Sequence, residues 1–392
     1  MKLFFWTSFV ICILASAIAA LYYNKHQLVD VVSAASEIVN SYYDLTDYTP
    51  TALRLNKNQQ QNQQQQQQQQ QEDSHHHRHH HHHHHLFANE MSVHRAIRQV
   101  FLAVEQAEGA GARVRRSIGT PKLRNFSPFL MLDHFSIKPG AGFPDHPHRG
   151  QETITYLLQG GVDHEDFAGN KGTISSGDLQ FMTAGRGIVH AEMPRQNPDG
   201  SANVGLQLWV DLPSTLKATE PRYRDLRAAE IPRVDVDEGR ATVKVISGQS
   251  HGVDSVKDLA YTPVWILDVE LRPGGKVTQP LPQTWNAFSY VLEGDVYYGQ
   301  GDKRQKVEQY HITVFDREGD VVHVEAPADA TKNSRLVIVA GTPLDQPVVQ
   351  YGPFVLTTKE DVYKALMDYQ SFSNGFERAK DWRSEIGKSM MD

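Results

Sequence analysis

Two short residue pairs have the spacing of metal ligands that share a strand. The first is His146-Pro147-His148, and the second joins His190 to Glu192. On a β-strand, residues i and i+2 point to the same side, so each pair presents two donors on one face. If the two strands face each other inside a barrel, three imidazoles and one carboxylate converge. That donor set suits Fe, Mn, Ni, Cu or Zn, whereas Ca and Mg take mostly oxygen ligands.

Three further polar residues flank these pairs. Glu152 lies four residues after His148, so on a regular strand it points inward, where it fits a hydrogen-bonding role near the metal better than ligation. Arg149 and Arg186 adjoin the ligand segments. They are candidates for steering an anionic substrate, and the alternative is that they are surface or salt-bridging arginines.

Short alternating segments bounded by Gly, Asn, Asp and Pro dominate the chain after residue 91, which predicts an all-β fold of sandwiches or barrels. The expected strands are 153–158, 179–182, 204–212, 264–271, 287–292, 311–315, 321–324 and 336–340. A helix is expected only near the C-terminus. There, Thr358 and Asp361 form a capping box, and Val362, Ala365 and Tyr369 lie on one apolar helical face.

An internal repeat indicates that the core is a duplicated module. Residues 156–160 match 290–294 at an offset of 134, and residues 188–194 match 321–327 at an offset of 133. Two matches in the same order predict two β domains, at 91–225 and 233–392.

The repeat also predicts that the second module binds no metal. The offset of 134 places Pro280 and Pro282 at the positions of His146 and His148, and proline has no side-chain donor. His323 and Glu325 remain at the second pair's positions. They offer at most two ligands, too few for a tight site.

Composition excludes several classes of protein. The 392 residues carry a net charge of −7, which argues against a nucleic-acid binder that depends on bulk positive charge. The chain has one cysteine, so an intrachain disulfide framework and a Cys-rich zinc site are ruled out. We expect no direct nucleic-acid binding.

The first 90 residues differ from the rest. A basic start and an apolar run through residue 23 predict a cleaved signal peptide or, alternatively, a membrane anchor. Residues 24–90 contain Gln and His tracts, which predict a disordered linker. Translation from Met1 would thus direct the chain to the secretory pathway or tether it to a membrane. Translation from Met91 would yield the core alone, in the nucleus or cytoplasm.

Several of these segments resemble the pirin family of the cupin superfamily. They read FPDHPHRGQETITYLL at 143–158, SGDLQFMTAGRGIVHAEMP at 176–194, YGPFVLTT at 351–358 and NGFERAKDW at 374–382. The resemblance covers essentially the whole core and none of residues 1–90. It implies a bicupin, which is two stacked jelly-roll β-barrels, here followed by the C-terminal helix and preceded by the N-terminal extension. It also implies one transition-metal ion in the first barrel, most often Fe(II) or Fe(III), held by His146, His148, His190 and Glu192.

The resemblance allows two kinds of function. Some pirins have quercetin 2,3-dioxygenase activity, which implies a small phenolic flavonol and dioxygen as the partners of the site. Four protein ligands on an octahedral metal leave about two positions for them, and Glu192 could leave the metal and act as general base. Other members are nuclear, iron-dependent regulators that bind a transcription-related protein without turnover. A secretory leader departs from that nuclear pattern.

Overall fold

The computed structural model describes residues 92–388, apart from 110, 139, 257–259 and 302–303. The expected leader at 1–23 and the linker at 24–90 lie outside the described residues. Among the residues that are described, no helix is long and apolar enough to cross a membrane. Residues 89–392 form one compact unit.

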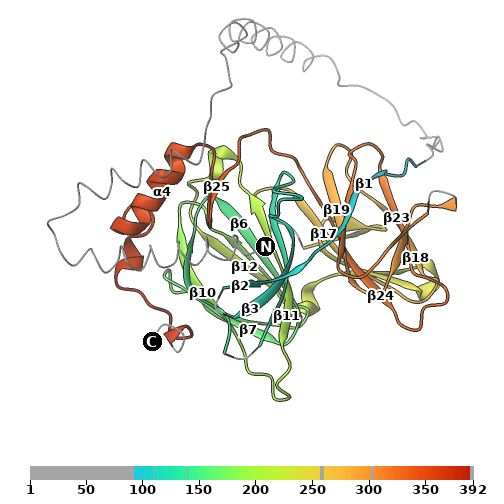
Figure 1. The fold of residues 1–392 in the computed structure, drawn as a ribbon, viewed down its shortest axis with the longest axis horizontal. Coiled ribbons are helices and arrows are strands. Elements are labelled where there is room, and N and C mark those ends of the chain that lie inside the picture. Colours follow the sequence, from blue (N-terminus) through green and yellow to red (C-terminus); the bar gives the residue numbers. More distant parts are fainter. Residues whose placement is uncertain (1–91, 110, 139, 257–259, 302–303, 389–392) are drawn as a thin grey trace, which may run out of the picture. The chain divides into compact units, whose positions relative to one another are not determined.

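The first barrel consists of a seven-stranded and a four-stranded antiparallel sheet (Figure 1). The seven-stranded sheet runs, in spatial order, β12 (Arg222–Leu226), β9 (Leu179–Thr183), β6 (Gln151–Gln159), β11 (Asn203–Asp211), β4 (Phe129–Ile137), β3 (Ala112–Ile118) and β2 (Glu105–Glu108). The four-stranded sheet runs β5 (Phe143–His148), β10 (Ile188–Pro194), β7 (Gly161–Asp166) and β8 (Lys171–Ser175).

The second barrel repeats this arrangement. Its seven-stranded sheet runs β1 (Ile97–Leu102), β22 (His311–Phe315), β19 (Asn286–Glu293), β24 (Ser334–Gly341), β17 (Val264–Leu271), β14 (Ala241–Ser247) and β13 (Arg233–Val236). Its four-stranded sheet runs β18 (Lys276–Pro280), β23 (Val321–Glu325), β20 (Val296–Tyr298) and β21 (Gln305–Val307). The predicted all-β fold with two barrels is therefore confirmed, and the predicted strands lie at the same places in the chain.

The remaining elements are short, except for one helix. They are β15 (Gln249–Ser250), β16 (Val253–Asp254), β25 (Val349–Tyr351), β26 (Phe354–Leu356), η2 (Ser214–Leu216), η3 (Ala228–Glu230), η4 (Asp237–Gly239), η6 (Glu377–Lys380) and α4 (Lys359–Ser371). The Thr358 side chain caps α4 by accepting the Asp361 N–H. The C-terminal helix and its cap are thus where the sequence predicts them.

The largest apolar core lies between the two barrels, where their seven-stranded sheets pack face to face. Ile154 and Tyr156 of β6 belong to it, together with Phe288 and Tyr290 of β19. Side chains on a strand alternate between faces. The other face of β6 is therefore left for the interior of the first barrel, where its polar residues lie.

Each end of the described chain joins the barrel that is distant in sequence. Strand β1 pairs with β22 and completes the sheet of the second barrel, at the place that β12 holds in the first. Helix α4 follows the second barrel but lies against the first (Figure 1), in a cluster that includes Val189 of β10. The part of the chain that follows β24, residues 342–388, is called the return segment. Arg149 fixes it through an ion pair of 2.7 Å with Asp368.

The repeat needs one correction in its register. Thr278 of β18 lies opposite His323 of β23, as His146 lies opposite His190 in the first barrel. The equivalents of His146 and His148 are therefore Thr278 and Pro280, and not Pro280 and Pro282. The offset of 134 holds for β6 and β19, but two additional residues lie in the loop before β19. Because the offset of 134 does not hold before that loop, it placed the equivalents of His146 and His148 two positions too late in the chain.

Candidate metal centre

Strands β5 and β10 bring the two predicted pairs together. They are antiparallel neighbours, with His146 opposite His190 and His148 opposite Ile188. Strand β5 is at the edge of its sheet, and this tolerates Pro144 and Pro147, because an edge strand can lack ladder donors. The sequence His-Pro-His can thus lie on a strand without leaving a broken ladder inside the barrel.

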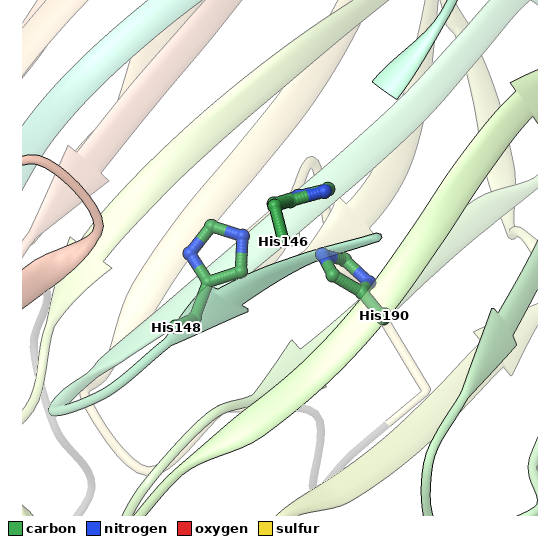
Figure 2. A group of neighbouring side chains, drawn as sticks. All are labelled: His146, His148 and His190. Atoms are coloured by element: carbon green, nitrogen blue, oxygen red, sulfur yellow. The ribbon is translucent and has the colours of Figure 1, made fainter. Parts of the chain in front are cut away.

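Three histidines form the centre of the site. Figure 2 shows the imidazole rings of His146 and His148, from β5, close to that of His190, from β10. One ring nitrogen of each lies within 4.8 Å of the others. The ring centroid of His146 is 4.4 Å from that of His190 and 5.0 Å from that of His148. This spacing allows all three rings to bind one ion.

The charge state and the free nitrogens of the rings fit a transition metal. Burial and the neighbouring histidines hold the pKa of His148 and of His190 well below the ordinary value, so both rings are neutral near pH 7. Neutral imidazole is the form that binds metal. The Nε2 atom of His190 is buried and has no hydrogen-bond partner. A bound ion would satisfy this atom, so the residues present fit a metal.

Glu192 lies beside the three histidines but outside their 4.8 Å group. The register shift opposite Glu192 comes from one extra residue in β5, whereas β10 pairs regularly with β7 from His190 to Pro194. His190 and Glu192 therefore point to the same side of β10, as the i, i+2 spacing predicts. The Thr155 hydroxyl donates to Glu192 Oε1 over 3.1 Å, and the Gln207 amide donates to Oε2 over 3.0 Å. Gln207 in turn accepts the indole N–H of Trp209. This chain of hydrogen bonds fixes the carboxylate in a buried position next to the candidate metal.

A cavity of about 940 Å³ reaches this group of residues. His146, His148 and Glu192 line it together with Gln207 and Trp209. Its other walls include apolar side chains and the return segment that follows the second barrel: Leu130, Met131, Phe135, Phe143, Val348, Val349 and Pro353. The candidate metal centre thus opens into a space large enough for a multi-ring organic molecule, within the range of about 300–1,000 Å³ that ligand pockets span.

The structure places Glu152 away from the candidate metal centre, contrary to the prediction that it points inward. Its carboxylate accepts the Thr183 hydroxyl and the backbone N–H groups of Tyr261 and Thr262. Gly150, with φ +80°, makes a turn between β5 and β6. The count of four residues from His148 therefore does not follow one regular strand, and the interior positions of β6 are Gln151 and Thr155.

The two flanking arginines also have other partners. Arg149 donates to Asp368 and to the backbone oxygens of Arg186 and Asn374, which makes it part of the attachment of α4. Arg186 is half exposed and lies 3.3 Å from Glu220. Both arginines follow the alternative reading, in which they form ion pairs and are not part of the cavity wall.

Four residues that contact the site were not singled out from the sequence: Gln151, Thr155, Gln207 and Tyr223. Gln151 and Tyr223 reach the Nδ1 atoms of His148 and His190, at 2.9 and 3.5 Å. The polar residues at alternate positions 151, 153 and 155 of β6 were a usable signal. Gln207 and Tyr223 lie on β11 and β12, and the sequence alone does not show that these strands lie close to the histidines.

Comparison with known proteins agrees with this architecture. The family model described as Pirin matches residues 111–210, and the one described as Pirin C-terminal cupin domain matches residues 266–375. Pirin of Homo sapiens is 51% identical over 287 residues, which are 73% of this chain and 96% of that protein. A pirin-like protein of Solanum lycopersicum is 47% identical over 291 residues, 74% of this chain and 97% of its own length.

A solved structure extends the comparison. The crystal structure of a quercetin 2,3-dioxygenase from Acinetobacter baumannii is 29% identical, with a TM-score of 0.65. The match covers 71% of this chain and 98% of that one. Both barrels are cupin domains, and on these matches the chain belongs to the pirin family.

Proposed function

We propose that this chain is a metal-dependent dioxygenase that acts on a flavonol such as quercetin. The observation that carries the proposal is the cavity of about 940 Å³ that His146, His148 and Glu192 all line. It combines a candidate metal, a fixed carboxylate and room for an aromatic substrate. The likeness to a quercetin 2,3-dioxygenase supports the same reading.

Iron is the metal we propose, with Mn, Ni, Cu or Zn as alternatives, because a site of three neutral imidazoles accepts any of these borderline ions. His146, His148 and His190 would hold it, with Glu192 as the fourth ligand when its carboxylate turns inward. A bound transition metal supplies Lewis acidity toward the phenol and electron exchange with dioxygen.

Glu192 is the residue we assign to proton transfer. Its carboxylate lines the cavity and is positioned by Thr155 and Gln207, so it can take the proton of the flavonol 3-hydroxyl as general base. The same hydrogen bonds hold its two oxygens while the carboxylate is off the metal.

The walls of the cavity would orient the substrate. Apolar side chains from β4 and β5, such as Met131 and Phe143, line the cavity together with Trp209 and with Pro353 of the return segment. Aromatic and aliphatic walls bury planar rings and exclude water. The flavonol would lie among these side chains with its 3-hydroxyl toward Glu192.

The test is aerobic turnover by the iron-loaded protein. The chain is prepared without residues 75–85, because the His tract could retain metal. Quercetin absorbance and released carbon monoxide are followed together, with Glu192→Gln as the control. Loss of absorbance with matched carbon monoxide release supports the dioxygenase. Iron bound without turnover would reject it and favour the iron-dependent regulator that binds a protein partner.

We further propose that residues 1–23 direct the chain to the secretory pathway or to a membrane when translation starts at Met1. The apolar run in that segment is the supporting observation. Microsomal fractionation of C-terminally tagged protein tests it. A soluble nuclear or cytoplasmic full-length product would contradict it, whereas a product that begins at Met91 would support the second start site.

A further inference from the structure

Gln151 is the first residue of β6, directly across the Arg149-Gly150 turn from the ligand His148. Its side chain is fully buried, and its amide nitrogen lies 2.9 Å from His148 Nδ1. Thr155, on the same face of β6, contacts Glu192. Gln151 is therefore built into the interior of the first barrel, behind the metal ligands.

In the other two ligand histidines, the Nδ1 atom contacts either a backbone oxygen or a more distant side chain. His146 Nδ1 lies 2.8 Å from the backbone oxygen of Pro144, a contact that no side-chain exchange alters. His190 Nδ1 lies 3.5 Å from the hydroxyl of Tyr223, which is the limit for a hydrogen bond. Two side chains thus contact an Nδ1 atom of the three histidines, and the contact from Gln151 is the shorter one.

The direction of the Gln151 amide determines which nitrogen of His148 holds the proton. As the amide stands, its NH₂ group donates to Nδ1, so the ring proton is on Nε2 and that atom cannot bind a metal. At the same time, Gln151 Oε1 is buried without a partner. If the amide turns end for end, Oε1 accepts an Nδ1–H, and Nε2 presents its lone pair to the metal.

We propose that Gln151 is a positioning residue for the metal centre, whose amide carbonyl selects the metal-binding tautomer of His148. Ligating histidines commonly donate their outer N–H to an oxygen acceptor, and loss of such a contact costs 10–100-fold in metal affinity. This inference rests on the metal site of the proposed function and is independent of its substrate.

Two substitutions separate this role from simple packing. Gln151→Leu retains bulk but removes the acceptor, and Gln151→Glu retains an acceptor and strengthens it. If Gln151 only packs, Leu is tolerated and Glu harms the site, because it buries a carboxyl group. If Gln151 positions His148, the order is reversed.

The matched control is Gln279→Leu. Gln279 is also a buried glutamine, in β18 of the second barrel, and its amide contacts Ser250 and backbone oxygens and no metal ligand. The loss of a buried amide is thus reproduced at a position remote from the histidines. Thermal unfolding of the metal-free protein shows whether Gln151→Leu folds. If it does not, Gln151→Met provides a variant of the original length that lacks the amide oxygen and has only a weakly accepting thioether in its place.

The experiment measures cobalt(II) affinity by competition with a chromogenic chelator, on the chain without residues 75–85. We expect Gln151→Leu to weaken affinity about 10–100-fold, and Gln151→Glu to bind at least as tightly as the parent, with a shifted cobalt absorption spectrum. Gln279→Leu should bind like the parent.

Cobalt affinity equal to the parent's in Gln151→Leu, or weaker binding by Gln151→Glu than by Gln151→Leu, would overturn the inference. A parent that binds no cobalt would overturn the metal site itself. If the parent turns over quercetin but the Gln151 variants do not show the predicted order of cobalt affinities, only the role of Gln151 is rejected.

Discussion

His146 and His190 are cross-strand partners in the pairing of β5 with β10, with ring centroids 4.4 Å apart. The same two positions in the second barrel hold Thr278 and His323. The duplicated fold therefore presents two facing side chains in each barrel, and the identity of one residue decides whether they are both metal donors.

Removal of two facing ligands should abolish metal binding. The variant His146→Ala/His190→Ala, without residues 75–85, retains one of the three imidazoles. Loss of a hydrogen-bond partner of a ligand already costs up to roughly 100-fold in metal affinity, so we expect the loss of two ligands to lower iron affinity further. Inductively coupled plasma analysis after dialysis gives the stoichiometry. One full equivalent of iron in this variant would contradict the assignment of the site.

Replacement of Glu192 should affect turnover more than metal content. Glu192→Gln keeps the size of the side chain and removes the base. General-base catalysis contributes about 10²–10⁴-fold, so we expect the turnover number for quercetin to fall by that range. Metal content is measured on the same sample, and Gln207→Glu serves for comparison because it disturbs the contact to Glu192 without removing the base. Unchanged turnover in Glu192→Gln would exclude the assigned role.

The second barrel should bind no tight metal ion. His323 Nδ1 lies 2.7 Å from the Thr278 hydroxyl, and Glu325 lies 3.4 Å from Arg304. Within the described residues, the three first-barrel histidines are the group of metal donors that lies close enough to share an ion. We expect about one transition-metal ion per chain after deletion of the His tract. A second ion that is lost in His323→Ala/Glu325→Ala would overturn this expectation.

His134 should make the stability of the protein sensitive to acid. Burial and the nearby Arg115 and Arg335 lower the pKa of His134 to about 4. Between pH 6.5 and 4 the unfolded chain binds a proton at this residue that the folded chain does not, so stability is complete above pH 6.5 and is lost as the pH falls toward 4. At 1.36 kcal/mol per pH unit, the loss is at most about 3 kcal/mol.

The comparison is between the parent and His134→Gln, both metal-loaded. Urea unfolding at pH 7 and at pH 4.5 gives the free energy of unfolding. The variant should lose less stability than the parent over this interval, although it also loses the contact between His134 and Tyr290 seen at 3.2 Å. Equal losses in the two proteins would assign the acid sensitivity to other groups.

The sequence predicts well what depends on local pattern. Alternation and turn residues locate the strands, and the i, i+2 rule identifies His146, His148 and His190 because each pair lies on a single strand. Glu152 was misjudged because a turn at Gly150 separates it from His148, and turn geometry is not part of the alternation rule. The partners of the ligands, such as Gln207 and Tyr223, depend on which strands become neighbours, and this is determined by the whole barrel.

The exchange of chain ends between the barrels has a consequence for the integrity of the protein. Strand β1 completes the sheet of the second barrel, and the return segment around Pro353 forms a wall of the cavity in the first. A protease cut between Leu226 and Ile231 would therefore produce two pieces, each of which holds part of the other's fold, so the nicked protein would stay assembled. For the same reason, neither half of this duplication could be lost or transferred to another protein without opening a sheet edge or a cavity wall in the half that remains.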